Sequence, residues 1–150
     1  MKFFAETKTV LARRRMRGVT LIELLTVIVV VAILGSIATS SYRSYLLRTN
    51  RTEARMALLR VQAAQEKFFL QNRRYADDDE IALAPPEGLG VPATSVPGNF
   101  YSISISEHTD TTYTAKAVAI NGQTSDKANC QVLTINELGE RTPLEGDCWR

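Results

Sequence analysis

A run of 19 residues without a formal charge, Leu24 to Tyr42, is the feature that most restricts what this chain can form. As an α-helix rising about 1.5 Å per residue, the run is long enough to cross the hydrocarbon core of a bilayer. A basic segment, Arg13 to Gly18 (RRRMRG), precedes it, and one acid, Glu23, stands at its edge. We therefore expect residues 19–42 to form a membrane-spanning helix.

Glu23 is the residue of this segment that calls for a function. An isolated carboxylate in a membrane helix costs about 2.5–3.5 kcal/mol on insertion scales, so it is expected to have a cationic partner. Cleavage of the chain after Gly18 would make Val19 a free α-amino terminus. The amine of a neighbouring subunit would then supply the cation that Glu23 needs.

The junction resembles the type IV prepilin signature: a basic leader ending in glycine, then an apolar residue, Thr, Leu, a further apolar residue and Glu. In this chain the signature reads Gly18, Val19, Thr20, Leu21, Ile22 and Glu23. The resemblance implies that a prepilin peptidase cuts after Gly18 and N-methylates Val19. It also implies that the mature helix packs into a pilus, with Glu23 setting the register of assembly.

The same resemblance implies partners and a location. The partners would be prepilin peptidase, other major and minor pilins, the assembly platform of the inner membrane, and membrane lipid before assembly. The precursor would cross the inner membrane once, with a cytoplasmic leader and a periplasmic C-terminal domain, and would then join an extracellular pilus. A modest excess of basic residues on the leader side favours this orientation.

Other interpretations of the N-terminal segment remain open. A secretory signal would have the same basic and apolar regions, with Ala38-Thr39-Ser40 as its cleavage site, but would not require Glu23. A simple membrane anchor for a periplasmic binding domain would give no role to Gly18 or Glu23. A pseudopilin of a type II secretion system shares the whole N-terminal pattern, although that branch usually lacks a C-terminal disulfide loop.

The charge of the chain changes once the leader is set aside. The sequence has 18 Lys and Arg against 16 Asp and Glu, but residues 1–18 hold six of the bases and one of the acids. The remainder therefore carries a net charge of −3, with 12 bases and 15 acids. DNA binding is usually driven by clustered Lys and Arg, so nucleic acid is not expected as a main partner.

The helix is predicted to continue beyond the membrane through residues 43–75, because no Gly or Pro occurs between Ser36 and Ala84. Its apolar side chains form two stripes at helical spacing. One stripe could cover a sheet while the other meets neighbouring subunits, or both could be buried within one domain. The first stripe holds Tyr45, Met56, Leu59, Ala63 and Leu70, and the second holds Leu58, Val61 and Phe68.

Residues 76–99 read as a loop linker, and residues 100–150 as an antiparallel sheet. The linker begins with four acids, Asp77 to Glu80, which are expected to be a solvated charge run because they match no calcium-loop spacing. Three runs in the C-terminal part have strand character, which predicts a meander of three to four strands. The predicted fold class is therefore α+β, a long N-terminal helix packed on a sheet, which is also the type IV pilin fold. The runs are Phe100 to Ser106, Thr112 to Ile120 and Gln131 to Asn136.

Cys130 and Cys148 are the only cysteines, and in an oxidising compartment they are expected to form one disulfide. Such a loop resembles the disulfide-bounded C-terminal region of type IV pilins, which the family uses for subunit contacts and recognition. The segment NELGERT within it and the ending DCWR resemble minor pilins of the PilE type. The resemblance narrows the expected function to a minor pilin subunit that enters or primes a pilus for twitching motility or adhesion.

No catalytic residue, cofactor, metal site or small-molecule substrate is predicted. The single histidine, His108, lies in a polar stretch between two strand runs and is read as a turn residue. The chain has no nucleophile elbow, Gly-rich phosphate loop or metal-ligand box.

Overall fold

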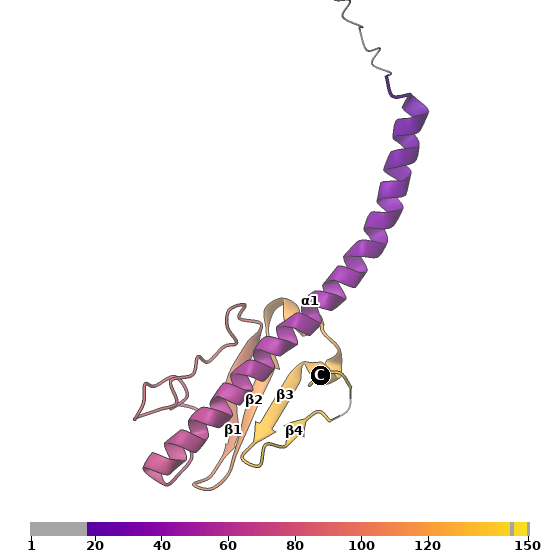
Figure 1. Ribbon diagram of the computed structural model, residues 1–150. Helices are drawn as coiled ribbons and strands as arrows, with labels where there is room; N and C mark the ends of the chain where they lie inside the picture. The colour runs from indigo at the N-terminus through magenta and orange to yellow at the C-terminus, as the bar shows by residue number, and fades with distance from the viewer. Residues whose placement is uncertain (1–17, 145, 150) are drawn as a thin grey trace, which may run out of the picture. The chain divides into compact units, whose positions relative to one another are not determined.

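The computed structural model describes residues 18–144 and 146–149, apart from the side chain of Ser40. The leader residues 1–17 lie outside the described residues. The chain divides into two compact units at Thr39 and Ser40. Helix α1, Leu21–Asn72, begins in the first unit and ends in the second (Figure 1).

The first unit consists, in its described part, of the apolar beginning of α1. Every described residue from Gly18 to Thr39 is exposed, including Leu21 at 88% and Val30 at 54%. By length and composition, α1 contains one segment apolar enough to cross a membrane. The apolar surface of this unit therefore has no cover within the described chain.

The second unit contains a four-stranded antiparallel sheet in the order β1-β2-β3-β4. Its strands are β1 (Tyr101–His108), β2 (Tyr113–Ala119), β3 (Val132–Asn136) and β4 (Arg141–Thr142), and two 3-10 turns, η1 (Asn121–Ser125) and η2 (Ala128–Cys130), connect β2 to β3. The predicted meander is confirmed, and its three predicted strands agree with β1 to β3 to within two residues at each end. His108 is the last residue of β1 and not a turn residue as predicted.

The core lies between the sheet and the part of α1 that crosses it (Figure 1). Alternate residues of β2 are buried, three of them alanines, so the middle of the sheet offers little bulk and leaves room for the helix. Of the two predicted stripes, only the second is buried, while the first is exposed over its whole length. The buried residues of the helix are Arg51, Ala54, Ala57, Leu58, Val61, Gln65 and Phe68.

The helix ends at Asn72, three residues before the predicted end of its amphipathic part. The fully buried side chain of Gln65 holds the chain that follows, because its amide donates to the carbonyl of Ala76 and accepts from the N–H of Ala76, both at 2.8 Å. His108 Nε2 lies 2.8 Å from the carbonyl oxygen of Tyr75. The loop is thereby fastened to the helix and to the edge strand.

The four acids at the start of the loop do more than the predicted solvated charge run. Glu80 pairs with Arg74, and this hydrogen bond holds the pKa of Glu80 below its usual value. Asp77 accepts from the backbone N–H groups of Asp79 and Glu80, and Asp78 accepts from the N–H of Ile105 at 2.7 Å. The prediction overlooked that three of these carboxylates fix the loop to itself and to β1.

Candidate functional site

The predicted processing and register residues lie together at the start of α1. Gly18 and Val19 precede the helix, and Glu23 lies in its first turn. An acid at this end interacts favourably with the helix dipole. Glu23 makes no side-chain hydrogen bond or ion pair with any residue in the described part of the chain, so its carboxylate is available to a partner outside the chain.

Thr20 has a role at this junction that the sequence reasoning missed. Its Oγ1 accepts a hydrogen bond from the backbone N–H of Glu23 at 3.3 Å, which caps the helix. The spacing of Thr20 and Glu23 is that of a capping box, and this signal could have identified the helix start. Thr20 thereby fixes where the helix begins relative to the predicted cut.

A buried ion pair joins the helix to the turns that connect β2 to β3. Arg51 Nε and Nη2 donate to Asp126 Oδ2 and Oδ1 at 2.7 and 2.5 Å, and both residues are less than 7% exposed. Burial alone would raise the pKa of Asp126, but hydrogen bonds from Arg51, the N–H of Lys127 and Gln123 outweigh it and hold that pKa below its usual value. The pair therefore stays ionised inside the domain.

Gln123 completes this buried network. Its Nε2 atom lies within hydrogen-bonding distance of Asp126 Oδ2, the hydroxyl of Tyr101 and the carbonyl of Leu47, at 2.9 to 3.1 Å. Its Oε1 atom accepts from Asn50 at 3.0 Å. Arg51 and Asp126 are 75 residues apart, so no local sequence signal could have paired them.

Cys130 and Cys148 form the predicted disulfide, with a Cα–Cα distance of 5.3 Å. Both are buried, and the carbonyl of Cys130 accepts from the hydroxyl of Tyr101 at 3.3 Å. Beyond the disulfide, Trp149 donates from Nε1 to the carbonyl of Thr142 at 2.9 Å, and the guanidinium of Arg141 lies over its ring. The loop closed by the disulfide contains β3 and β4 and is tied to the core at its base.

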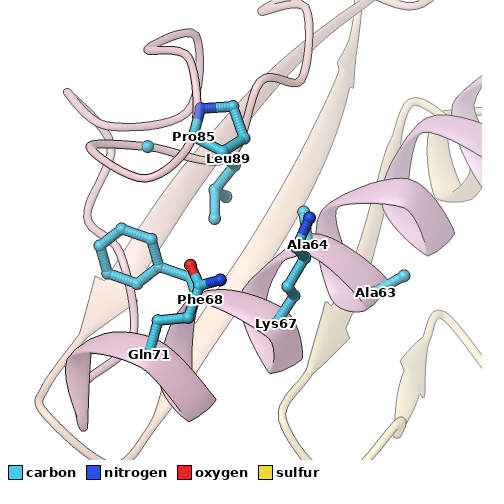
Figure 2. Close-up of a pocket in the computed structure, with 8 residues that line it drawn as sticks. Ala63, Ala64, Lys67, Phe68, Gln71, Pro85 and Leu89 are labelled. Carbon is cyan, nitrogen blue, oxygen red and sulfur yellow. The ribbon is translucent and has the colours of Figure 1, made fainter.

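A groove of about 300 Å³ lies between the second half of α1 and the loop of residues 76–99 (Figure 2). Phe68 and the helical residues around it line one side, and Pro85 and Leu89 line the other. Gly88 also lines the groove, and a Cβ there would come within 2.2 Å of the carbonyl oxygen of Glu80, so this position requires glycine. Lys67 is the one titratable residue in the lining, which gives the groove no acid and base pair for catalysis.

Comparison with known proteins agrees with this arrangement. Residues 40–134, more than half of the chain, match a family model described as "Type IV minor pilin ComP, DNA uptake sequence receptor". Residues 13–39 match a model described as a prokaryotic N-terminal methylation motif, which includes the junction at Gly18 and the acid at Glu23. The chain belongs to the type IV pilin family.

Two relatives extend the comparison. The chain is 39% identical over 75 residues to the type IV major pilin protein PilA of Myxococcus xanthus (strain DK1622). That alignment covers 49% of this chain, and the chain spans about a third (34%) of the length of this relative. A solved type IV pilin from Shewanella oneidensis superposes with a TM-score of 0.50 at 25% identity, over 69% of this chain and 98% of the other. The long helix on a four-stranded sheet is therefore the type IV pilin fold.

Proposed function

We propose that the chain is a minor pilin subunit of a type IV pilus, of the PilE type, which enters or primes the filament for twitching motility or adhesion. The observation that carries the proposal is the described part of the first unit, residues 18–39, whose apolar side chains are all exposed and whose one acid, Glu23, makes no side-chain hydrogen bond or ion pair with the described residues. Such a surface needs lipid before assembly and other pilin helices after it. The methylation motif over residues 13–39 supports the same conclusion.

In the proposed sequence of events, prepilin peptidase cuts after Gly18 and N-methylates Val19. Before the cut the subunit crosses the inner membrane once, with the leader in the cytoplasm and the second unit in the periplasm. The assembly platform then passes the subunit to the pilus, where the apolar helix contacts other major and minor pilins. The first described residues, Gly18 and Val19, are exposed, so nothing in the described chain covers the bond to be cut.

Glu23 is proposed to set the register of the subunit by pairing with the terminal amine of a neighbouring pilin. In a low-dielectric filament core the two charges attract strongly, but desolvation offsets much of that gain. The pair therefore specifies position more than it adds stability. Because Glu23 belongs to the first unit and makes no side-chain hydrogen bond or ion pair with the described residues, its loss is expected to leave the second unit folded.

Glu23→Ala tests this role against Glu87→Ala, a control that removes an exposed acid without a side-chain hydrogen bond in the described residues. We expect the Glu23 variant to be depleted from sheared pili and retained in the membrane, while the Glu87 variant assembles normally. Thermal unfolding of both variants should match that of the original protein. A Glu23 variant that enters pili in normal amounts would overturn the register role.

The intact mass and N-terminal residue of the protein from sheared surface filaments test the function as a whole. A chain that begins at N-methylated Val19 is expected, and an abundance well below that of the main subunit would identify a minor pilin. A chain that begins at Met1 and stays in the membrane would favour the anchored binding domain instead. Recovery with a secretion complex and not with pili would favour a pseudopilin, against which the disulfide of Cys130 and Cys148 speaks.

DNA is the second candidate partner, because the matching family is described as a DNA uptake sequence receptor. The net charge of −3 after the leader speaks against a strong general affinity for nucleic acid. Gel-shift titration of the full chain with duplex DNA at two salt concentrations distinguishes the cases. Binding that weakens steeply with salt would add DNA as a partner of the pilus subunit. The absence of binding up to about 100 μM would remove DNA as a candidate partner.

We propose no catalytic activity for the second unit. Its one histidine, His108, is engaged with the carbonyl of Tyr75, and the described residues contain no group of three or more His, Cys, Asp or Glu arranged to hold a metal. A purified chain that turns over a substrate in proportion to its concentration would contradict this.

A further inference from the structure

A small polar pocket of about 150 Å³ lies in the second unit, close along the chain to the end of the apolar run. One side belongs to α1, and the other to the end of η1 and the two residues that follow it. The two sides hold hydroxyl and cationic groups, together with the carboxylate of Asp126, which is paired with Arg51. The lining residues are Ser44, Leu47, Arg48, Arg51, Ser125, Asp126 and Lys127.

The charge balance of this pocket is positive. Arg51 and Asp126 are buried and neutralise each other. Arg48 and Lys127 are exposed, and neither has an ion pair within the described part of the chain. Asp147 also lies near enough to contribute to the raised pKa of Arg51, after the larger effect of the hydrogen bond with Asp126. With Asp147 counted, the site still carries a net charge of about +1 from these five groups.

The position of the pocket along the chain selects the source of the anion. Ser44 and Arg48 follow Tyr42, the last residue of the uncharged run, by two and six helical residues, or about 3 and 9 Å of rise. The headgroup layer on each side of a bilayer is about 5–8 Å thick. Tyr42 and Tyr45 are both exposed, and tyrosine is enriched at membrane interfaces. The pocket is therefore within reach of lipid phosphates.

We propose, relying on the pilin function only for the membrane anchoring of the apolar segment, that this pocket binds the phosphate of an anionic phospholipid headgroup. Arg48 and Lys127 supply the charge, and Ser44, whose hydroxyl makes no hydrogen bond within the described residues, supplies a hydrogen-bond donor. The buried pair of Arg51 and Asp126 holds the two sides of the pocket together. The contact tethers the second unit to the bilayer surface until the subunit is extracted.

The test is native mass spectrometry of the full chain in detergent micelles, titrated with phosphatidylglycerol. The variant Arg48→Gln with Lys127→Gln is compared with Arg60→Gln with Lys67→Gln, which removes two exposed cations of α1 that lie about 27 and 37 Å of helical rise beyond Tyr42. Each interfacial cation contributes about fivefold to affinity, so the pocket variant should bind about 25-fold more weakly. The control variant should bind like the original protein.

Several results would overturn the proposal. Equal weakening in both variants, or in neither, would show that the lipid is held by general charge or by other residues. Equal affinity for phosphatidylcholine would remove the requirement for an anionic lipid, and equal affinity for glycerol 3-phosphate would point to a free phosphate ester. Loss of duplex DNA binding in the pocket variant with lipid binding unchanged would assign the site to nucleic acid. The lipid titration needs no filament, so a negative result would overturn the lipid site alone. The pilus function would still be tested separately by the intact mass and N-terminal residue of the protein from sheared filaments.

Discussion

The two halves of helix α1 treat apolar surface in opposite ways. Up to Thr39 the helix exposes every described side chain, as at Val30 with 54%. Beyond Ser40 it buries one stripe against the sheet, as at Leu58 with 0%. The apolar surface of the first half therefore needs a cover from outside the chain. The buried stripe of the second half is covered by the sheet of the same chain.

Because of this difference, the contribution of α1 to the folding of the domain can be tested separately from its contribution to membrane and filament contacts. Changes in the second half should affect the folding of the domain, because its partners are in the same chain. Changes in the first half should affect the membrane and the filament, because its partners are lipid and other subunits. Substitutions matched between the halves can break or sharpen this separation.

The largest effect is expected from breaking the buried ion pair. Asp126→Asn leaves Arg51 buried without its counter-charge, which typically costs about 3–5 kcal/mol. Urea unfolding of the full chain in micelles measures this loss as a lower midpoint for the second unit. Asp79→Asn, at an exposed position in the loop, is the control and should change the free energy of unfolding by less than about 0.5 kcal/mol.

The same pair predicts how stability depends on pH. The pKa of Asp126 is lowered in the folded state, so its contribution is complete above the unfolded value of about 3.9 and is lost as the pH falls below it. We expect the stability of the second unit to decline below about pH 4. Asp126→Asn should flatten that decline, and Glu80, whose pKa is also lowered, should account for part of what remains.

A matched pair of alanine substitutions compares the two halves directly. Leu58→Ala removes a fully buried side chain and should lower the free energy of unfolding by about 2–5 kcal/mol. Val30→Ala removes an exposed one and should leave domain unfolding unchanged. If Val30→Ala destabilised the domain as much as Leu58→Ala, the two halves would not be independent.

Removing the disulfide should have an intermediate effect. Replacing Cys130 and Cys148 together by serine is expected to cost about 3 kcal/mol by the loop-entropy model. Thermal unfolding with and without reductant measures this cost. The original protein should lose stability on reduction, while the double variant should not respond to reductant.

The smallest effect is expected at the helix start. Thr20→Ala removes the cap and should cost about 1 kcal/mol locally. Hydrogen exchange at the first amides of α1 should become faster, with no change in the second unit. Thr20→Ser, which keeps the hydroxyl, should retain the slow exchange.

The sequence predicted the features that depend on residues close together in the chain, and it did not predict those that depend on contacts between distant residues. The long helix and the strands β1 to β3 follow from local composition and alternation, and the spacing of Thr20 and Glu23 holds a local signal for the start of the helix that the prediction overlooked. The strand β4 has two residues, too few to show a period, and it pairs only because the chain turns back beside β3. The pair Arg51 and Asp126 and the clamp of Gln65 on Ala76 depend on tertiary topology, which no window of sequence contains.

The disulfide also has a mechanical consequence. The 18 residues of separation between Cys130 and Cys148 could extend to about 60 Å in an unlinked chain, but the bond holds their Cα atoms 5.3 Å apart. A pulling force between the helix and the C-terminal end of the domain would pass through the two sulfur atoms and bypass β3 and β4. A subunit under tension would therefore yield first in the segments outside this ring, and the surface displayed by the loop would keep its shape under load.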